Sequence, residues 1–149
     1  MTSRLTELTV DCHDPERLAA FWCAALGFEV IDRHAGTVEI GSWEPSIEQV
    51  RARQMPPTLL FARVPEGKTV KNRLHLDLSP IDAGTEQEVR RLLGLGATRT
   101  GTRTGTRTGT RTGTRTGRAW VVMADPEGNE FCVQRSLEPA GRPGVRHGA

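Results

Sequence analysis

The sequence predicts an α+β fold of two tandem βαβββ modules, whose eight strands form a cupped sheet with the helices on the outside. Two observations carry this prediction. Each half of the chain has one amphipathic helical segment, preceded by an alternating strand-like segment and followed by further strand-like segments. The halves also align at a nearly constant offset, because Glu7 and His75 are 68 positions apart and Gly27 and Gly96 are 69 apart.

The first half reads as a strand, a helix and three strands. Leu8 and Val10 alternate with polar residues between residues 5 and 11, as in a half-buried strand. Asp14 is a good N-cap for a helix that begins at Pro15, and Gly27 is placed to end it in the left-handed conformation. Strands are then expected at residues 28–32, 37–42 and 58–64, with one helical turn near residues 47–50.

The second half repeats this order. Residues 73–78 alternate strictly, with leucines on one face and Arg73, His75 and Asp77 on the other. A helix is predicted for residues 85–95, with a capping box between Thr85 and Glu88. The remaining strands are expected in the tract that begins at residue 98 and at residues 119–124 and 130–135, with a Pro- and Gly-containing turn at residues 125–129.

Residues 98–117 repeat the tetrapeptide TRTG five times. Threonine favours extended backbone and glycine at every fourth position disfavours a helix, so the tract is interpreted as two strand ends around a low-complexity loop. Six of the 20 basic residues lie between residues 99 and 118; without them, 14 basic residues oppose 18 acidic ones, a net charge of −4. The alternative is a polyanion-binding arm, but the tract has no aromatic residue on which bases could stack, which disfavours nucleic acid as a partner.

Composition excludes several other classes of protein. No apolar run approaches ~18 residues, and the N-terminus lacks the apolar region of a secretory signal. The three cysteines have neither the number nor the spacing of a disulfide framework or a zinc knuckle. We therefore expect a cytoplasmic protein with no membrane partner, and a disordered tail over residues 137–149, which are rich in Gly, Pro and Arg.

Three groups of motifs carry a family resemblance. They are DCHDP, LAAFW and LGF between residues 11 and 28; FARVPEGK and KNRLHLDL between residues 61 and 78; and VMADPEGNEFCV at residues 122–133. Together they resemble the vicinal oxygen chelate superfamily of glyoxalases, bleomycin resistance proteins and dioxygenases, and within it the small actinobacterial-type glyoxalase-like proteins. The resemblance spans roughly residues 4–136, excluding the TRTG tract at residues 98–117, and it implies a cup that often holds a divalent metal. The expected glyoxalase-like domain is residues 1–136, with module one at about 4–64 and module two at about 73–136.

The resemblance also implies which residues would hold that metal, namely one on the first and one on the last strand of each module. These positions are Glu7, His75 and Cys132 here, and the fourth, near residues 60–62, has no ligating side chain. Three protein ligands and a water can form a catalytic zinc site, although the thiol departs from the family's His and Glu set. The alternatives are that His75 is a polar cavity residue bonded to a neighbour and that Cys132 is a small buried hydrophobe.

Other side chains are candidates to line the cup. In an enzyme, Glu7 would be the general base and His75 would stabilise an enolate; the alternative for Glu7 is a strand carboxylate in an ion pair. Arg73 would hold a substrate carboxylate, or form an internal salt bridge instead. Lys71 is interpreted as a connector between the modules. The remaining candidate substrate-binding residues are Trp120, Trp43, Glu130 and Gln134.

The resemblance implies two functions, both with a small-molecule ligand. One is a lyase or isomerase that acts on an oxygenated carbonyl compound in the cup, with or without a divalent metal. The other is a non-catalytic protein that sequesters a hydrophobic or aromatic small molecule, which the missing fourth ligand favours. The resemblance further implies a homodimer.

Overall fold

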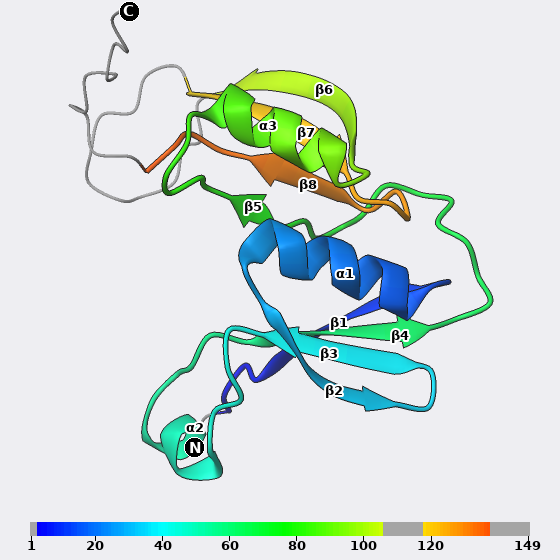
Figure 1. Cartoon of the computed structure of the whole chain (residues 1–149), viewed down its shortest axis with the longest axis vertical. Coiled ribbons are helices and arrows are strands. Elements are labelled where there is room, and N and C mark those ends of the chain that lie inside the picture. The colour runs from blue at the N-terminus through cyan, green and yellow to red at the C-terminus, as the bar shows by residue number, and fades with distance from the viewer. Residues whose placement is uncertain (1–2, 106–117, 138–149) are drawn as a thin grey trace, which may run out of the picture.

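The computed structural model of the chain describes residues 3–105 and 118–137, and it arranges them as two similar modules (Figure 1). The middle of the TRTG tract and the predicted tail from residue 138 onward lie outside the described residues. Module one contains β1 (Glu7–Cys12), α1 (Pro15–Leu26), β2 (Glu29–His34), β3 (Thr37–Gly41), α2 (Ile47–Ala52) and β4 (Thr58–Arg63). Module two contains β5 (Asp77–Leu78), α3 (Thr85–Gly94), β6 (Thr98–Gly105), β7 (Arg118–Ala124) and β8 (Glu130–Val133).

Each module forms its own four-stranded mixed sheet. The strand orders are β1-β4-β3-β2 and β5-β8-β7-β6, with the first strand parallel to the last and the other pairs antiparallel. The α+β class and the tandem βαβββ modules are therefore confirmed, and the eight strands are hydrogen-bonded as two sheets of four. Figure 1 shows α1 over the sheet of module one and α3 over the sheet of module two. In the described part of the chain, each helix is too short or too polar to span a bilayer.

Helix α1 has the ends that its sequence predicts. The side chain of Asp14 accepts a hydrogen bond from the backbone N–H of Arg17 (3.1 Å), which satisfies a donor of the first turn. Gly27 adopts the left-handed conformation with φ of 69°, and its N–H donates to the carbonyl of Cys23. Both ends of this helix therefore form as the local sequence predicts.

Helix α3 covers the predicted segment, but the prediction of a capping box between Thr85 and Glu88 is wrong. The N-cap is Gly84, which offers no side chain, so Thr85 lies inside the helix. The hydroxyl of Thr85 donates instead to the carbonyl of Gln134 (3.1 Å), and the carboxylate of Glu88 binds Arg91. Thr85 thus has a tertiary partner and Glu88 a partner in its own helix, so neither side chain caps the start of α3.

The strand predicted at residues 73–78 is regular only at its last two residues. There Asp77 pairs with Cys132, and Leu78 pairs with the next residue of β8. Upstream, the backbone N–H of Asn72 donates to the side chain of Glu130 (3.1 Å), and Leu74 is exposed. The segment before β5 therefore leaves the edge of the sheet, and strict alternation of its side chains does not hold there.

The two modules share one hydrophobic core. The rings of Phe21 and Trp22 on α1 pack against Phe131 on β8, with centroid separations of 6.1 Å and 5.2 Å. Buried side chains of both sheets surround this aromatic contact, among them Leu18, Ile40, Phe61, Val89, Leu92, Met123 and Val133. Burial of apolar surface on this scale is the main stabilising contribution to the fold, and here it requires both modules.

Polar groups of module two also bind α1 along its whole length. The carboxylate of Glu127 accepts from the backbone N–H groups of His13 (2.8 Å) and Asp14 (2.7 Å) just before the helix. The indole of Trp22 donates to the buried carboxylate of Asp125 (3.3 Å). At the other end, the guanidinium of Arg91 donates to the carbonyls of residues 24 and 25 (2.8 and 3.0 Å), which have no partner in the next turn of the helix.

Substitution of Arg91 tests the attachment of α1 to module two. We expect Arg91→Met to lower the free energy of unfolding by about 1–3 kcal/mol, because it leaves helix carbonyls and the nearly buried Glu88 without their donor. The matched control Arg90→Met removes an exposed arginine from the preceding position and should stay within about 0.5 kcal/mol of wild type. Urea unfolding measures both; equal effects of the two variants would contradict the end-capping role.

Candidate functional site

Three potential ligand side chains converge where β5 and β8 pair. The donor atoms of His75, Asp77 and Cys132 all lie within 4.8 Å of one another, and the imidazole Nδ1 is 3.8 Å from the Asp77 carboxylate. Two features of the backbone produce this cluster. His75 lies two residues before Asp77, just upstream of β5, and Asp77 is directly opposite Cys132 in the parallel pair.

The cluster lines a hollow of about 240 Å³ on the face of the module-two sheet that points away from the core. Apolar surface forms most of its lining, and it is called the polar hollow here after the polar side chains that meet in it. Strand alternation explains the choice of face, because Val121, Phe131 and Val133 are buried in the core while their neighbours line the hollow. The lining residues are Lys71, His75, Asp77, Trp120, Val122, Cys132 and Gln134.

A second, mainly apolar cavity of about 390 Å³ lies between the modules and shares His75 with the polar hollow. Apolar side chains from both modules form most of its wall, namely Leu8, Val10, Trp22, Leu59, Phe61, Leu74 and Leu76. Polar groups, including Asn72, Asn129 and Glu130, line the rest. His75 therefore has polar donors on one side and a space suited to a carbon skeleton on the other.

The donor set of the cluster fits a borderline-soft divalent metal. Imidazole nitrogen, carboxylate oxygen and thiolate sulfur are the three ligand types of zinc, and a thiolate favours zinc over manganese or magnesium. Cys132 is buried, whereas His75 and Asp77 are exposed, so a metal could reach the cluster from solvent. Three protein ligands would leave a position for a water or a substrate oxygen.

The structure brings together four of the residues singled out from the sequence. His75, Cys132, Trp120 and Gln134 line the same polar hollow. Asp77 and Lys71 join them there. The sequence could have indicated Asp77, because it lies two residues after His75. No sequence pattern indicates Lys71, because the segment before β5 is irregular.

Three other predicted residues lie outside both hollows. Glu7 is exposed on β1, where its carboxylate accepts from the hydroxyl of Thr9 (3.3 Å). Arg73 is exposed, and Trp43 is 46% exposed on the loop that follows β3. The geometry therefore does not place Glu7 beside His75 as its proposed partner in catalysis.

Glu130 lines the apolar cavity but is engaged in an ion pair. Its carboxylate accepts from Lys68 Nζ (2.9 Å) and from the backbone N–H of Asn72 (3.1 Å). Burial disfavours the charged form, but these hydrogen bonds outweigh it and lower the pKa of Glu130 from its ordinary 4.5 to about 2. The side chain thus fastens the linker between the modules to β8 and is a poor proton acceptor.

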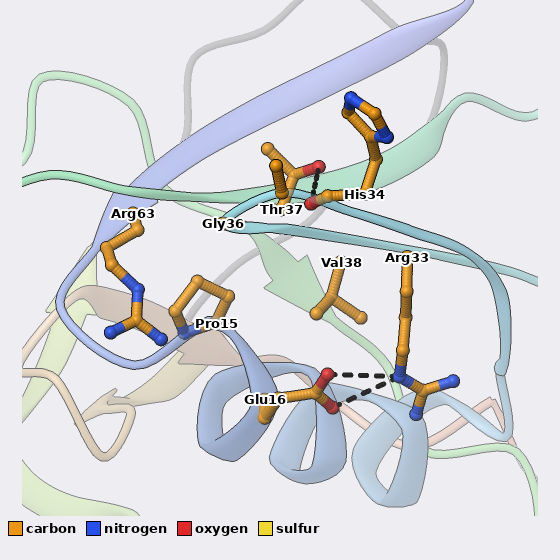
Figure 2. Close-up of a pocket in the computed structure, with 9 residues that line it drawn as sticks. Pro15, Glu16, Arg33, His34, Gly36, Thr37, Val38 and Arg63 are labelled. Atoms are coloured by element: carbon orange, nitrogen blue, oxygen red, sulfur yellow. Dashed lines mark hydrogen bonds and ion pairs between the residues drawn. The ribbon is translucent and has the colours of Figure 1, made fainter.

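A separate hollow of about 280 Å³ lies between the start of α1 and the turn that joins β2 to β3 (Figure 2). Figure 2 shows Arg63 and Arg33 on opposite sides of it, with Glu16 bound to Arg33 Nε (3.0 Å). None of the residues predicted as site residues lines this hollow. Glu16 neutralises Arg33, and among the described residues this hollow holds no group of metal-ligating side chains like the one at His75.

Comparison with known proteins agrees with this fold. The family model for the glyoxalase-like domain matches residues 7–134. The chain belongs to the glyoxalase-like domain family. The match covers both modules, including β5 and β8 with the His75 cluster. No curated protein matches the sequence.

Solved structures share the fold of this glyoxalase-like protein at low sequence identity. A glyoxalase/bleomycin resistance protein/dioxygenase family enzyme from Burkholderia phytofirmans is 18% identical, with a TM-score of 0.59 and coverage of 91% of this chain and 100% of that one. The fosfomycin resistance protein FosX from Mesorhizobium loti is 13% identical, with a TM-score of 0.59 and coverage of 92% and 95%. FosX from Listeria monocytogenes, in complex with Mn(II) and dihydroxypropylphosphonic acid, is 12% identical, with a TM-score of 0.60 and coverage of 92% and 93%.

The ion pair of Glu130 makes a prediction about pH. Because the folded-state pKa is depressed, the ion pair stabilises the fold above pH 4.5, and this contribution is lost as the pH falls from about 4.5 to about 2. Glu130→Gln should therefore be less stable than wild type at pH 7, and the difference should shrink over that pH range. The control Glu86→Gln, which removes an exposed partner of Arg99, should show little difference at any pH. Thermal unfolding as a function of pH distinguishes the two.

Proposed function

We propose that this protein binds an oxygenated small molecule in the two hollows that meet at His75. The observation that carries the proposal is this meeting of a three-donor cluster with an apolar cavity of about 390 Å³. Small-molecule sites are concave and mainly apolar, with a few convergent polar groups that orient the ligand. Both properties occur together here at one side chain.

Each part of the site has a role in this binding. The apolar cavity takes the carbon skeleton, whose burial supplies most of the affinity. The amide of Gln134 can donate to or accept from ligand oxygens, and the indole of Trp120 forms a flat wall of the polar hollow. These two side chains limit how the oxygenated end of the ligand can be oriented.

His75, Asp77 and Cys132 would hold a divalent metal in this site. When bound, such an ion supplies Lewis-acid polarisation of ligand oxygens. The Listeria FosX structure combines Mn(II) with a dihydroxypropylphosphonic acid, so a protein of this fold binds an oxygenated ligand together with a divalent metal. The thiol of Cys132 favours zinc in the His75 cluster of this chain.

Zinc binding tests this site directly. We expect the purified protein, dialysed against zinc and analysed by atomic absorption, to retain one zinc per chain. His75→Ala and Cys132→Ser should each weaken zinc binding at least about tenfold, because each removes one of three ligands. The matched controls His34→Ala and Cys23→Ser remove an exposed histidine and a half-buried cysteine outside the cluster and should bind zinc as wild type does. Retention of zinc by both site variants would contradict the assignment.

A second candidate function is a lyase or isomerase, favoured by the proximity of His75 and Asp77. A neutral imidazole with a carboxylate 3.8 Å away can take a proton from a carbon next to a carbonyl group, since the carboxylate stabilises the imidazolium that forms. The proton that leaves the carbon is then held on the imidazole until it is returned to the product. In this metal-free form of the site, His75 is the base in place of the predicted Glu7.

Exchange of solvent deuterium into hydroxyacetone distinguishes catalysis from binding. If His75 is the base, wild-type protein should catalyse the exchange, as followed by NMR, and His75→Ala should lose it while His34→Ala keeps it. Ligand binding without exchange would refute the enzymatic candidate and leave the binding proposal intact.

A further inference from the structure

We propose that the hollow between the start of α1 and the β2–β3 turn binds a phosphate dianion, either free or as the phosphate group of a small monoester. This hollow is separate from the two that meet at His75 and shares no lining residue with them. The inference therefore goes beyond the proposed function. It depends on two arginines that line one small hollow and on the carboxylate of Glu16 beside them.

The backbone of module one places both arginines at this hollow (Figure 2). Arg33 lies near the end of β2, and Arg63 is the last residue of β4, on the other side of β3. The backbone N–H of Arg63 donates to the carbonyl of Gly36 in the β2–β3 turn (2.8 Å). The hydroxyl of Thr37 donates to the carbonyl of His34 across the same turn (2.9 Å). Both arginines are therefore attached to hydrogen-bonded backbone at the wall of the hollow.

Arg63 has a positive charge without a partner in the described part of the chain. Its guanidinium makes no hydrogen bond and no ion pair among residues 3–105 and 118–137. The side chain is exposed, so a ligand can reach it from solvent. A guanidinium offers five N–H donors in a planar fork that suits phosphate oxygens. Arg63 is thus the first donor of the proposed site.

Arg33 uses only part of its guanidinium. The hydrogen bonds found for this side chain leave from Nε and go to the two carboxylate oxygens of Glu16 (3.0 and 3.3 Å). Its Nη1 and Nη2 groups make no hydrogen bond within the described ranges. Both side chains of this ion pair are 58% exposed, and such pairs contribute little to stability. A stronger anion can therefore replace Glu16 at Arg33 with little loss.

The charge of the hollow favours a dianion. With His34 neutral, two arginines and one carboxylate give its lining a formal charge of +1. A ligand with one carboxylate would only replace the carboxylate that Glu16 already supplies from the same chain. A phosphate dianion attracts both guanidinium groups more strongly, and its tetrahedral oxygens can accept paired hydrogen bonds from forks on two sides.

The size of the hollow limits what the phosphate can carry. Its volume of about 280 Å³ is near the lower end of the range of about 300–1,000 Å³ for small-molecule sites. The buried side chains of Pro15 and Val38 supply a small apolar part of the lining. The hollow therefore suits a phosphate group with few additional atoms.

Titration calorimetry at low ionic strength tests this site with inorganic phosphate, glycerol phosphate and acetate, at a pH above about 6, where phosphate groups become dianions. We expect wild type to bind both phosphates more tightly than acetate. Arg63→Met should weaken phosphate binding about fivefold or more, because it removes the unpaired guanidinium. Glu16→Gln should strengthen it about threefold or more, because it removes the competing carboxylate.

The matched controls are Arg17→Met and Glu29→Gln, which change the net charge equally at exposed positions outside the hollow. Both should bind phosphate as wild type does. The proposal is overturned if each variant behaves like its control, if Glu16→Gln weakens binding, or if wild type binds neither phosphate.

The two phosphate probes identify the source of the ligand. Equal affinities would assign the free ion, and tighter binding of glycerol phosphate would assign a monoester; either result supports the site. Zinc binding and deuterium exchange at His75 do not enter these measurements. Failure of the proposed function therefore leaves this inference standing, and the converse also holds.

Discussion

The attachment of α1 to module two is the constraint on which the rest of the structure depends. Glu127 binds the backbone just before the helix, Asp125 binds the indole of Trp22, and Arg91 binds the carbonyls at the helix end. The aromatic contact with Phe131 fills the space between these polar contacts. A helix held in this way cannot shift relative to the second sheet without loss of these hydrogen bonds and of apolar contacts together.

Strand β8 connects the attachment of α1 with the candidate site. Because successive side chains point to opposite faces of a sheet, Phe131 packs into the shared core while Cys132 faces the polar hollow. Glu130, one residue earlier, holds the linker through Lys68 and Asn72. One four-residue strand thus connects the core, the metal-type cluster and the segment that carries Lys71, so a disturbance of core packing should also reach the site.

The cluster at His75 serves both candidate functions with the same atoms. As a metal site it uses nitrogen, oxygen and sulfur from two adjacent strands, and as a metal-free pair it uses the contact between imidazole and carboxylate. A bound metal would take the imidazole lone pair that proton transfer needs. Metal binding and base catalysis at His75 therefore exclude each other. The metal content of the protein decides which of the two His75 can perform.

The sequence by itself determined the repeated βαβββ order, the ends of α1 and the family, because caps, alternation and turn residues act over a few neighbouring positions. It also singled out His75 and Cys132. The tertiary structure decided what lies beside them. Asp77 joins the cluster because it is opposite Cys132 in the strand pair. Lys71 lines the hollow in place of Arg73, because the bond from Asn72 to Glu130 holds the segment before β5 away from the sheet edge. Glu7 lines neither hollow because it lies at the start of β1, whereas Leu8 and Val10 of the same strand line the apolar cavity. The pairing that places β1 joins residues far apart in the chain, so the sequence does not show it.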